Sequence, residues 1–111
     1  MTEKAYIPSA FTNYVTGVDK KDVAGIAACF TPDAVVQDEG HVYTGREAIR
    51  NWVARGFEEY QYTLAVKDIQ EKKSEWIATT LVTGTFDGSP IQLRFIFTLK
   101  DALMATLTIR S

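Results

Sequence analysis

Residues 30–52 read FTPDAVVQDEGHVYTGREAIRNW, and the layout of the chain can be worked out from this stretch. It begins where one amphipathic helical pattern ends and finishes inside another. Between the two patterns, a β-branched run leads directly into Asp38. In a half-buried strand the side chains alternate between two faces, so Val36 and Asp38 share one face. A carboxylate on the same face as a core valine is expected to point either at the core or into a cavity.

Three helices are predicted from apolar residues that recur at spacings of three and four. The first covers residues 11–18, and the second covers residues 23–30 after Asp22, which can cap its first turn. The third follows Thr44, which stands three residues before a glutamate in the form of a capping box. Gly56 is expected to end this third helix.

From residue 60 onward the apolar period changes from 3.6 to 2, which predicts a series of strands over residues 60–67, 76–86, 91–99 and 103–109. Polar turns separate them, and the strongest turn signal is the DGSP segment at residues 87–90. Strands of about ten residues twist, so a sheet made from them curls. The order of elements predicts an α+β fold, in which a curved antiparallel sheet packs against three N-terminal helices and encloses a pocket.

Composition is that of an ordinary globular protein. The 111 residues are expected to form one domain over residues 1–111, with 46% apolar and 23% charged residues. The net charge is −2 and no run of Lys and Arg exceeds two residues, so neither nucleic acid nor a membrane is expected as a partner. The N-terminus has no apolar signal segment, which predicts a cytoplasmic protein. A single cysteine and a single histidine make a metal site unexpected, and no cofactor is predicted.

The same stretch resembles the ketosteroid isomerase-like and SnoaL-like branch of the nuclear transport factor 2-like superfamily. The resemblance rests on F-x-x-D-A-V-V-x-D, on G-R-E-A-I-R-x-W, and on the segment that reaches back to Tyr14. It implies a cone-shaped fold whose pocket lies between a bent sheet and the helices. The superfamily holds isomerases, dehydratases, cyclases and many non-catalytic members, so the resemblance is more specific for the fold than for the function.

Asp38 and Tyr14 are the candidate catalytic residues. Burial beside Val36 would raise the pKa of the Asp38 carboxyl, and a base tuned in this way is useful near neutral pH. The resemblance implies that Asp38 moves a proton between two carbons of an enone and that Tyr14 donates a hydrogen bond to the developing enolate oxygen. Two structural alternatives stay open: Asp38 could cap a turn at a strand end, and Tyr14 could be a core residue bonded to the backbone.

The family pattern is incomplete in this chain. Ketosteroid isomerases pair the tyrosine with a protonated acid on a late strand, whereas residues 91–100 contain no Asp or Glu. The equivalent position falls on Leu93 or Phe95, so half of the expected oxyanion-binding site is missing. Three polar side chains could substitute in part: Gln92, Thr98 and Thr80.

The remaining site predictions concern the pocket wall and its mouth. His41 lies three residues after Asp38 and could pair with it, although a lone loop histidine is also a common solvated residue. The pocket is expected to be apolar and suited to a small, flat hydrophobic ligand. Its predicted lining is Phe11, Val18, Phe30, Val36, Trp52, Phe57, Tyr62, Leu93, Phe95 and Phe97.

Three functions are compatible with these features. The first is a cofactor-independent isomerase, dehydratase or cyclase that acts on a small hydrophobic carbonyl compound. The second is a non-catalytic module that binds a small hydrophobic ligand. The third is a dimerisation module with a filled pocket, since the resemblance implies a homodimer through the sheet. The predicted outer sheet face carries Arg94, Trp76, Thr79, Thr83 and Thr85.

Overall fold

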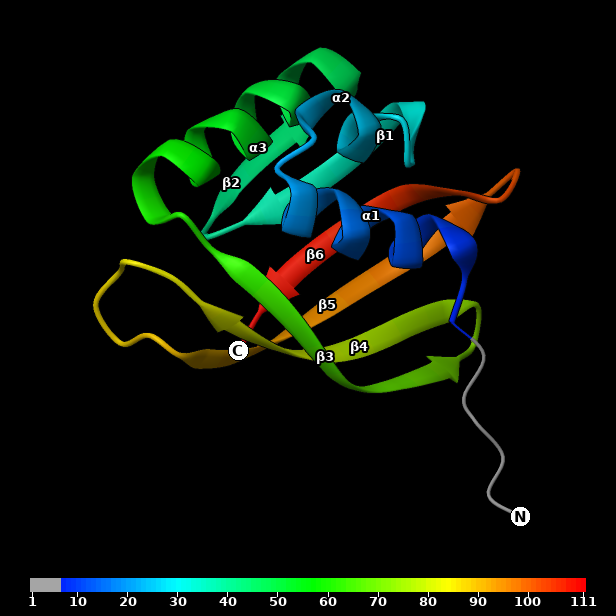
Figure 1. Cartoon of the computed structure of the whole chain (residues 1–111). Coiled ribbons are helices and arrows are strands. Elements are labelled where there is room, and N and C mark those ends of the chain that lie inside the picture. Colours follow the sequence, from blue (N-terminus) through cyan, green and yellow to red (C-terminus); the bar gives the residue numbers. More distant parts are fainter. Residues whose placement is uncertain (1–6) are drawn as a thin grey trace.

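The computed structural model describes residues 7–111, which form three helices packed on one side of a six-stranded sheet (Figure 1). The elements, in chain order, are α1 (Ser9–Lys20), α2 (Val23–Ala27), β1 (Phe30–Asp38), β2 (His41–Thr44), α3 (Arg46–Tyr60), β3 (Thr63–Lys72), β4 (Glu75–Thr83), β5 (Ile91–Lys100) and β6 (Leu103–Arg110). Within residues 7–111, no helix combines the length and the apolar character needed to span a membrane.

The sheet has the strand order β2-β1-β6-β5-β4-β3, which confirms the predicted α+β class and leaves the sheet unclosed. One pairing differs from the expected antiparallel sheet, because β1 runs parallel to β6. Local periodicity identifies each strand, but it carries no information on how segments about 70 residues apart pair. The sheet is therefore mixed, with β1 at the junction between the β1–β2 hairpin and the β3–β6 meander.

Helix α1 is anchored on the sheet by the apolar face that the sequence predicts. Phe11, Tyr14 and Val18 are all at most 1% exposed. The Phe11 ring stacks on Phe97 of β5, with centroids 4.8 Å apart and planes 11° apart. A fully buried side chain of this size contributes about 1.5–3 kcal/mol, so each of these three residues helps to fix α1 on the sheet.

Helix α2 is shorter than the predicted helix over residues 23–30. Asp22 caps it as expected, because its Oδ1 accepts a hydrogen bond from the Gly25 backbone N–H at 3.0 Å. A side chain at Gly25 would collide with this carboxylate, so the glycine makes the cap possible. Phe30 does not extend the helix, since it begins β1 and pairs with Met104 of β6. Tertiary strand pairing has overridden the local helical spacing.

Helix α3 differs from its prediction at both ends. Its N-cap is Gly45, and no side chain caps it, because Thr44 belongs to β2. At the other end the helix continues past Gly56. A Cβ atom at Gly56 would lie 3.2 Å from the ring of Tyr62. Gly56 therefore leaves room for a tyrosine ring instead of ending the helix.

The segment after β4 is fastened to the end of α3. The predicted strand over residues 76–86 stops at Thr83, where the chain leaves the sheet. The Thr85 backbone N–H then donates to the Tyr60 carbonyl oxygen at 2.7 Å, and the Thr85 Oγ1 hydroxyl donates to the same oxygen at 3.0 Å. Thr85 is thus committed to a loop contact and does not lie on the outer sheet face.

Trp76 lies in the core and not on the outer face where the sequence placed it. It is 8% exposed, and its ring is parallel to that of its register partner Phe97, with centroids 6.4 Å apart. Because side chains alternate along a strand, Thr79 and Thr83 point to the opposite face from Trp76. The outer face therefore keeps Thr79, Thr83 and Arg94 but lacks Trp76 and Thr85.

Candidate functional site

A cavity of about 850 Å³ lies where the Asp38 end of β1 meets α1, α3 and the other strands. This volume is within the usual range for small-molecule sites. Its apolar wall comes from Leu64, Val82, Leu93, Phe95 and Ile109. Tyr14 and Tyr62 face the same space, as do Tyr43 and Trp52. The cavity is therefore an apolar space with a small number of polar atoms on its wall.

The structure places the predicted lining residues in two groups. Trp52, Tyr62, Leu93 and Phe95 line the cavity. The others pack into the core between the helices and the sheet instead: Phe11, Val18, Phe30, Val36, Phe57 and Phe97. Periodicity identifies the inward face of a helix or strand, but it does not separate residues that fill the core from residues that border a cavity.

Asp38 is half-buried at the end of β1 and borders the cavity. The indole N–H of Trp52 donates to its Oδ2 at 3.1 Å. Burial raises the pKa of the Asp38 carboxyl, the Trp52 hydrogen bond opposes this increase, and the charge of Glu39 adds to it. No other described residue donates to this carboxylate, so Oδ1 can accept a proton from a bound molecule.

Tyr14 and Tyr62 form a pair of phenols on the cavity wall. Burial raises the pKa of Tyr14 well above its usual value, and it also raises the pKa of Tyr62. The negative charge of Asp38 acts in the same direction on both. Both phenols are therefore neutral near pH 7 and can act as hydrogen-bond donors.

The ring of Tyr62 is held in place by α3. It stacks on Phe57, with centroids 5.2 Å apart and planes 21° apart, and its edge faces Gly56. Trp52, on the same helix, packs against Tyr43 of β2 with centroids 5.9 Å apart. Helix α3 thus positions one group beside the carboxylate and another beside the phenol pair.

The substitutes considered for the missing acid do not reach the cavity. Gln92, Thr98 and Thr80 are absent from its lining. The Thr98 hydroxyl is bonded to that of Thr106 at 2.7 Å, and the Thr80 hydroxyl donates to the Ala78 carbonyl at 3.2 Å.

Tyr62 supplies the second polar group beside Tyr14, while the wall at Leu93 and Phe95 is apolar. Sequence reasoning included Tyr62 only as an apolar lining residue. The sequence did contain one signal for a polar role, because Tyr62 places a phenol on the inward face of the predicted strand.

The mouth of the cavity is charged. His41 is exposed and lies directly opposite Asp38 in the β1–β2 register. The other charged lining residues are Glu39, Arg55, Glu59, Asp87 and Arg110. The charges of Glu39 and then of Glu59 raise the pKa of the exposed Tyr60 phenol. Within residues 7–111, no group of His, Cys, Asp and Glu gathers in a way that could hold a metal ion.

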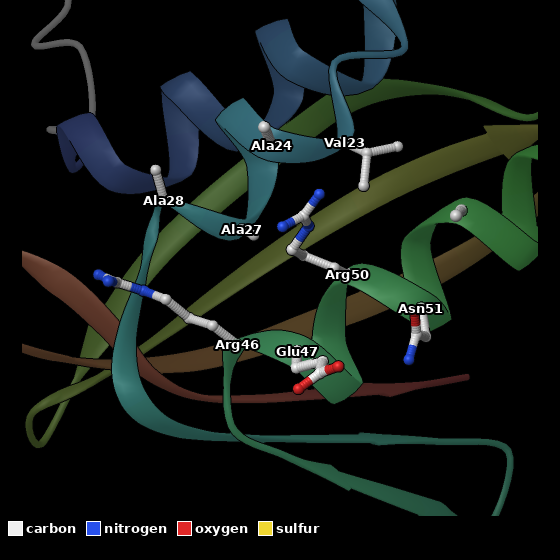
Figure 2. Close-up of a pocket in the computed structure, with 9 residues that line it drawn as sticks. Val23, Ala24, Ala27, Ala28, Arg46, Glu47, Arg50 and Asn51 are labelled. Atoms are coloured by element: carbon white, nitrogen blue, oxygen red, sulfur yellow. The ribbon is translucent and has the colours of Figure 1, made fainter.

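A second hollow of about 640 Å³ lies between α2 and α3 (Figure 2). Small side chains of α2 form one wall, and Arg46 and Arg50 extend from α3 (Figure 2). The Arg46 guanidinium donates twice to the Phe30 carbonyl oxygen, at 2.9 Å from Nε and 2.7 Å from Nη2, and so ties α3 to β1. This hollow contains neither a buried carboxylate nor a phenol, which makes the Asp38 cavity the better candidate.

Comparison with known proteins gives both a family and a fold. Residues 11–105 match the family model of the SnoaL-like domain. A candidate polyketide cyclase from Sinorhizobium meliloti is 30% identical, with a TM-score of 0.90 over 94% of this chain and 95% of that one. None of the curated proteins compared matches the sequence.

Two more distant structures share the fold alone. A protein from Catenulispora acidiphila with a ketosteroid isomerase-like fold, solved in complex with trimethylamine, is 15% identical with a TM-score of 0.83, over 96% of this chain and 87% of that one. A computationally designed 17-OHP binder is 15% identical with a TM-score of 0.79, over 93% and 88% of the two chains. The family match covers most of the chain and agrees with the fold and the cavity. The protein therefore belongs to the SnoaL-like domain family of the nuclear transport factor 2-like superfamily.

Proposed function

We propose that this protein is a cofactor-independent isomerase, dehydratase or cyclase that moves a proton on a small hydrophobic carbonyl compound. One observation carries the proposal: a half-buried carboxylate and a pair of neutral phenols border the same cavity of about 850 Å³. Asp38 is the general base, and the phenols of Tyr14 and Tyr62 stabilise the charge that develops on the substrate oxygen.

The reaction begins when Asp38 Oδ1 takes a proton from the carbon next to the carbonyl group. The electron pair of the broken C–H bond moves toward the carbonyl oxygen, which becomes an enolate. A phenol hydrogen bond stabilises this oxygen. The protonated Asp38 then returns its proton to a second carbon, which completes an isomerisation. Burial raises the pKa of this carboxyl, which makes the carboxylate a stronger base than one in water.

The apolar wall at Leu93 and Phe95 limits which substrates can react. Removing one donor from an oxyanion-binding site typically costs about 10²- to 10³-fold in rate. A site without the second acid therefore suits a substrate whose C–H bond is already acidified, such as one between two carbonyl groups. The similarity to a candidate polyketide cyclase supports this class.

A non-catalytic ligand-binding module is the second candidate. It is favoured by the two fold neighbours, one solved with trimethylamine and the other designed to bind 17-OHP. In such a module the cavity would bind a ligand without proton transfer. A homodimer through the outer sheet face and a cytoplasmic location, both expected from the sequence, stay predictions.

Proton exchange into D₂O tests the catalytic proposal directly. The probe is ethyl 2-oxocyclohexanecarboxylate, a hydrophobic compound with one acidified C–H, and the loss of its ¹H signal is followed by NMR. Because Asp38 is the base, Asp38→Asn should slow exchange by about 10²- to 10⁴-fold.

Glu39→Gln is the matched control, since it removes the neighbouring carboxylate from the same lining and should change the rate by only about twofold. Equal rates for wild type and Asp38→Asn would exclude Asp38 as the base. Wild-type exchange no faster than in buffer would favour the binding module.

A further inference from the structure

The inner face of β5 carries an apolar row that leads from the core to the mouth of the cavity. Phe95, Leu93 and Ile91 are two residues apart, so their side chains share one face of the sheet, and all three line the cavity. Their exposure rises along the strand, from 2% at Phe95 through the half-buried Leu93 to 39% at Ile91. At about 3.4 Å per residue, this row is about 14 Å long.

Strand register places the carboxylate at the inner end of the β5 row. Asp38 pairs with Ile109 of β6, and Ile109 pairs with Phe95 of β5. Neighbouring strands lie about 4.8 Å apart, so Asp38 is level with Phe95 and about 10 Å from it across the sheet. Ile91 lies further along β5, toward solvent. A ligand whose reacting carbon lies beside Asp38 therefore has an apolar wall that continues out of the cavity.

An aromatic pair borders the same opening. Tyr60 of α3 is 38% exposed, and its ring meets the edge of Phe86, with centroids 5.9 Å apart and planes 89° apart. Both rings line the cavity, as Ile91 does. A single exposed apolar side chain needs no explanation, but large apolar residues gathered around one pocket mouth are typical of a ligand-binding groove.

Phe86 is held in place before a ligand binds. It lies in the loop between β4 and β5, where Thr85 donates to the Tyr60 carbonyl oxygen through both its backbone N–H and its hydroxyl. Gly84 permits this close approach, since a Cβ atom there would lie 2.6 Å from the same oxygen and 2.9 Å from the Phe86 ring. The loop is therefore packed tightly on the end of α3, and the aromatic pair is a fixed part of the mouth.

We propose that the ligand is an elongated carbonyl compound whose apolar tail lies along the β5 row and leaves the cavity beside Phe86 and Tyr60. The carbonyl end lies beside Asp38, and this part rests on the proposed function. Because the row is continuous with the cavity wall, one molecule can occupy both. A compact ligand would leave the rim in water, whereas an alkyl tail covers it and gains affinity from the apolar surface removed from water.

A homologous series of esters tests the tail. Methyl 3-oxobutanoate, methyl 3-oxohexanoate and methyl 3-oxooctanoate share a C–H between two carbonyl groups and differ only in alkyl length. Their dissociation constants are measured by NMR titration of full-length Asp38→Asn protein, in which the proposed base is absent and proton transfer does not affect the result. We expect the affinity to rise by about twofold to fourfold for each added methylene.

Two further substitutions in this protein locate the effect. Ile91→Ala and Phe86→Ala should each reduce the rise to less than about twofold per methylene. Both should leave the affinity for methyl 3-oxobutanoate within about twofold, which also shows that the cavity is intact. Val42→Ala is the matched control, because Val42 is 59% exposed but does not line the cavity. It should leave the whole series unchanged.

An affinity that does not depend on alkyl length would overturn the proposal, and so would a failure of all three esters to bind. The same rise in Ile91→Ala and Phe86→Ala as in their parent, or an equal loss in Val42→Ala, would overturn the assigned path of the tail. Length-dependent binding together with equal proton exchange in wild type and Asp38→Asn would contradict the proposed catalysis alone. Exchange that requires Asp38, without any dependence on length, would contradict the tail alone.

Discussion

The two oxygens of the Asp38 carboxylate have different tasks. The Trp52 indole N–H holds Oδ2 at 3.1 Å, and Oδ1 is left to the cavity. This single hydrogen bond fixes the orientation of the carboxylate. It also lowers the pKa of Asp38, but it offsets only part of the increase that burial causes. Trp52 therefore positions the base without neutralising it.

Trp52→Phe should separate these two effects. Loss of the N–H donor removes the influence that lowers the pKa of Asp38, so the titration of this carboxyl should move to higher pH. Proton exchange at pH 7 should fall by about tenfold, since the carboxylate is no longer oriented. The titration is followed by ¹³C NMR of the labelled carboxyl group. Tyr43→Phe, which changes the ring packed on Trp52, is the control. An unchanged titration in Trp52→Phe would contradict this role.

At the scale of single residues, the sequence indicated Asp38 because a carboxylate followed a β-branched strand, and the structure places it at the cavity. The partner of Asp38 could not be predicted. Trp52 is a helical residue with an apolar side chain, and nothing in its spacing shows that its indole N–H meets a strand 14 residues earlier. The polar role of Tyr62 was missed for a similar reason, since it borders the same cavity as Tyr14 of α1, an element distant in the chain.

Helix α3 supports both halves of the candidate site. Trp52 meets the carboxylate, and one turn later Gly56 and Phe57 border the ring of Tyr62. Residues four apart lie on the same side of a helix, so a single helix face carries the supports for the base and for the donor. Arg46 fastens the first turn of this helix to β1 through the Phe30 carbonyl.

Gly56→Ala tests the role of this glycine. Ala is favoured over Gly by about 1 kcal/mol in a helix interior, but the added Cβ would lie 3.2 Å from the Tyr62 ring. In the wild-type background we expect a gain in unfolding free energy well below about 1 kcal/mol, or a loss. In a Tyr62→Ala background the contact is gone, and the full gain of about 1 kcal/mol should appear. Urea denaturation measures all four proteins. Equal gains in both backgrounds would show that Gly56 does not act through Tyr62.

At the scale of elements, predictions from local chemistry were confirmed for two features and wrong for the Thr44 cap, and the predictions that distant contacts decide were wrong. The Asp22 cap and the buried face of α1 depend on neighbours within one or two turns. Phe30 begins β1 and pairs with the distant strand β6 instead of extending α2, and Gly56 contacts the ring of Tyr62 outside the helix instead of ending α3. A glycine in a helical pattern is ambiguous between an end and a close contact, and here it marks a close contact.

For the molecule as a whole, the charge on Asp38 opposes folding. Burial raises the pKa of this carboxyl in the folded state above its unfolded value of 3.8. The group therefore contributes stability in full below about pH 3.8, and this contribution is lost as the pH rises through the folded-state pKa. At neutral pH the folded protein contains a partly desolvated charge that the unfolded chain would hydrate fully.

Asp38→Asn should consequently raise the melting temperature at pH 7, by about 2 °C for this partly exposed site, even though it removes the proposed base. Asn can still accept the hydrogen bond from Trp52, so the packing is kept. The difference between variant and wild type should shrink as the pH falls toward 4. Differential scanning calorimetry from pH 4 to pH 8 measures it. A lower melting temperature for the variant at pH 7 would contradict the sign derived from burial.

The curl of the sheet and the existence of a space between the layers could be predicted from the sequence. Strand length gave the curl, and the register shifts between Val66 and Asp68 and between Thr98 and Leu99 show where the backbone accommodates it. The extent of the cavity could not be predicted, because it depends on which inward side chains meet across the layers. Phe11 and Phe97 meet and fill the core, whereas Leu93 and Phe95 border open space.

The parallel pairing of β1 with β6 has a consequence for how the protein is made. Asp38 pairs in register with His41 of β2 and with Ile109 of β6, so the strand that carries the acid gains its second neighbour from a segment about 70 residues later in the chain. Contacts this distant in sequence close a large loop and form slowly. The β1–β2 hairpin and the β3–β5 hairpins join segments that are close in the chain, so we expect the pairing of β1 with β6, which completes the surroundings of the acid, to form after them.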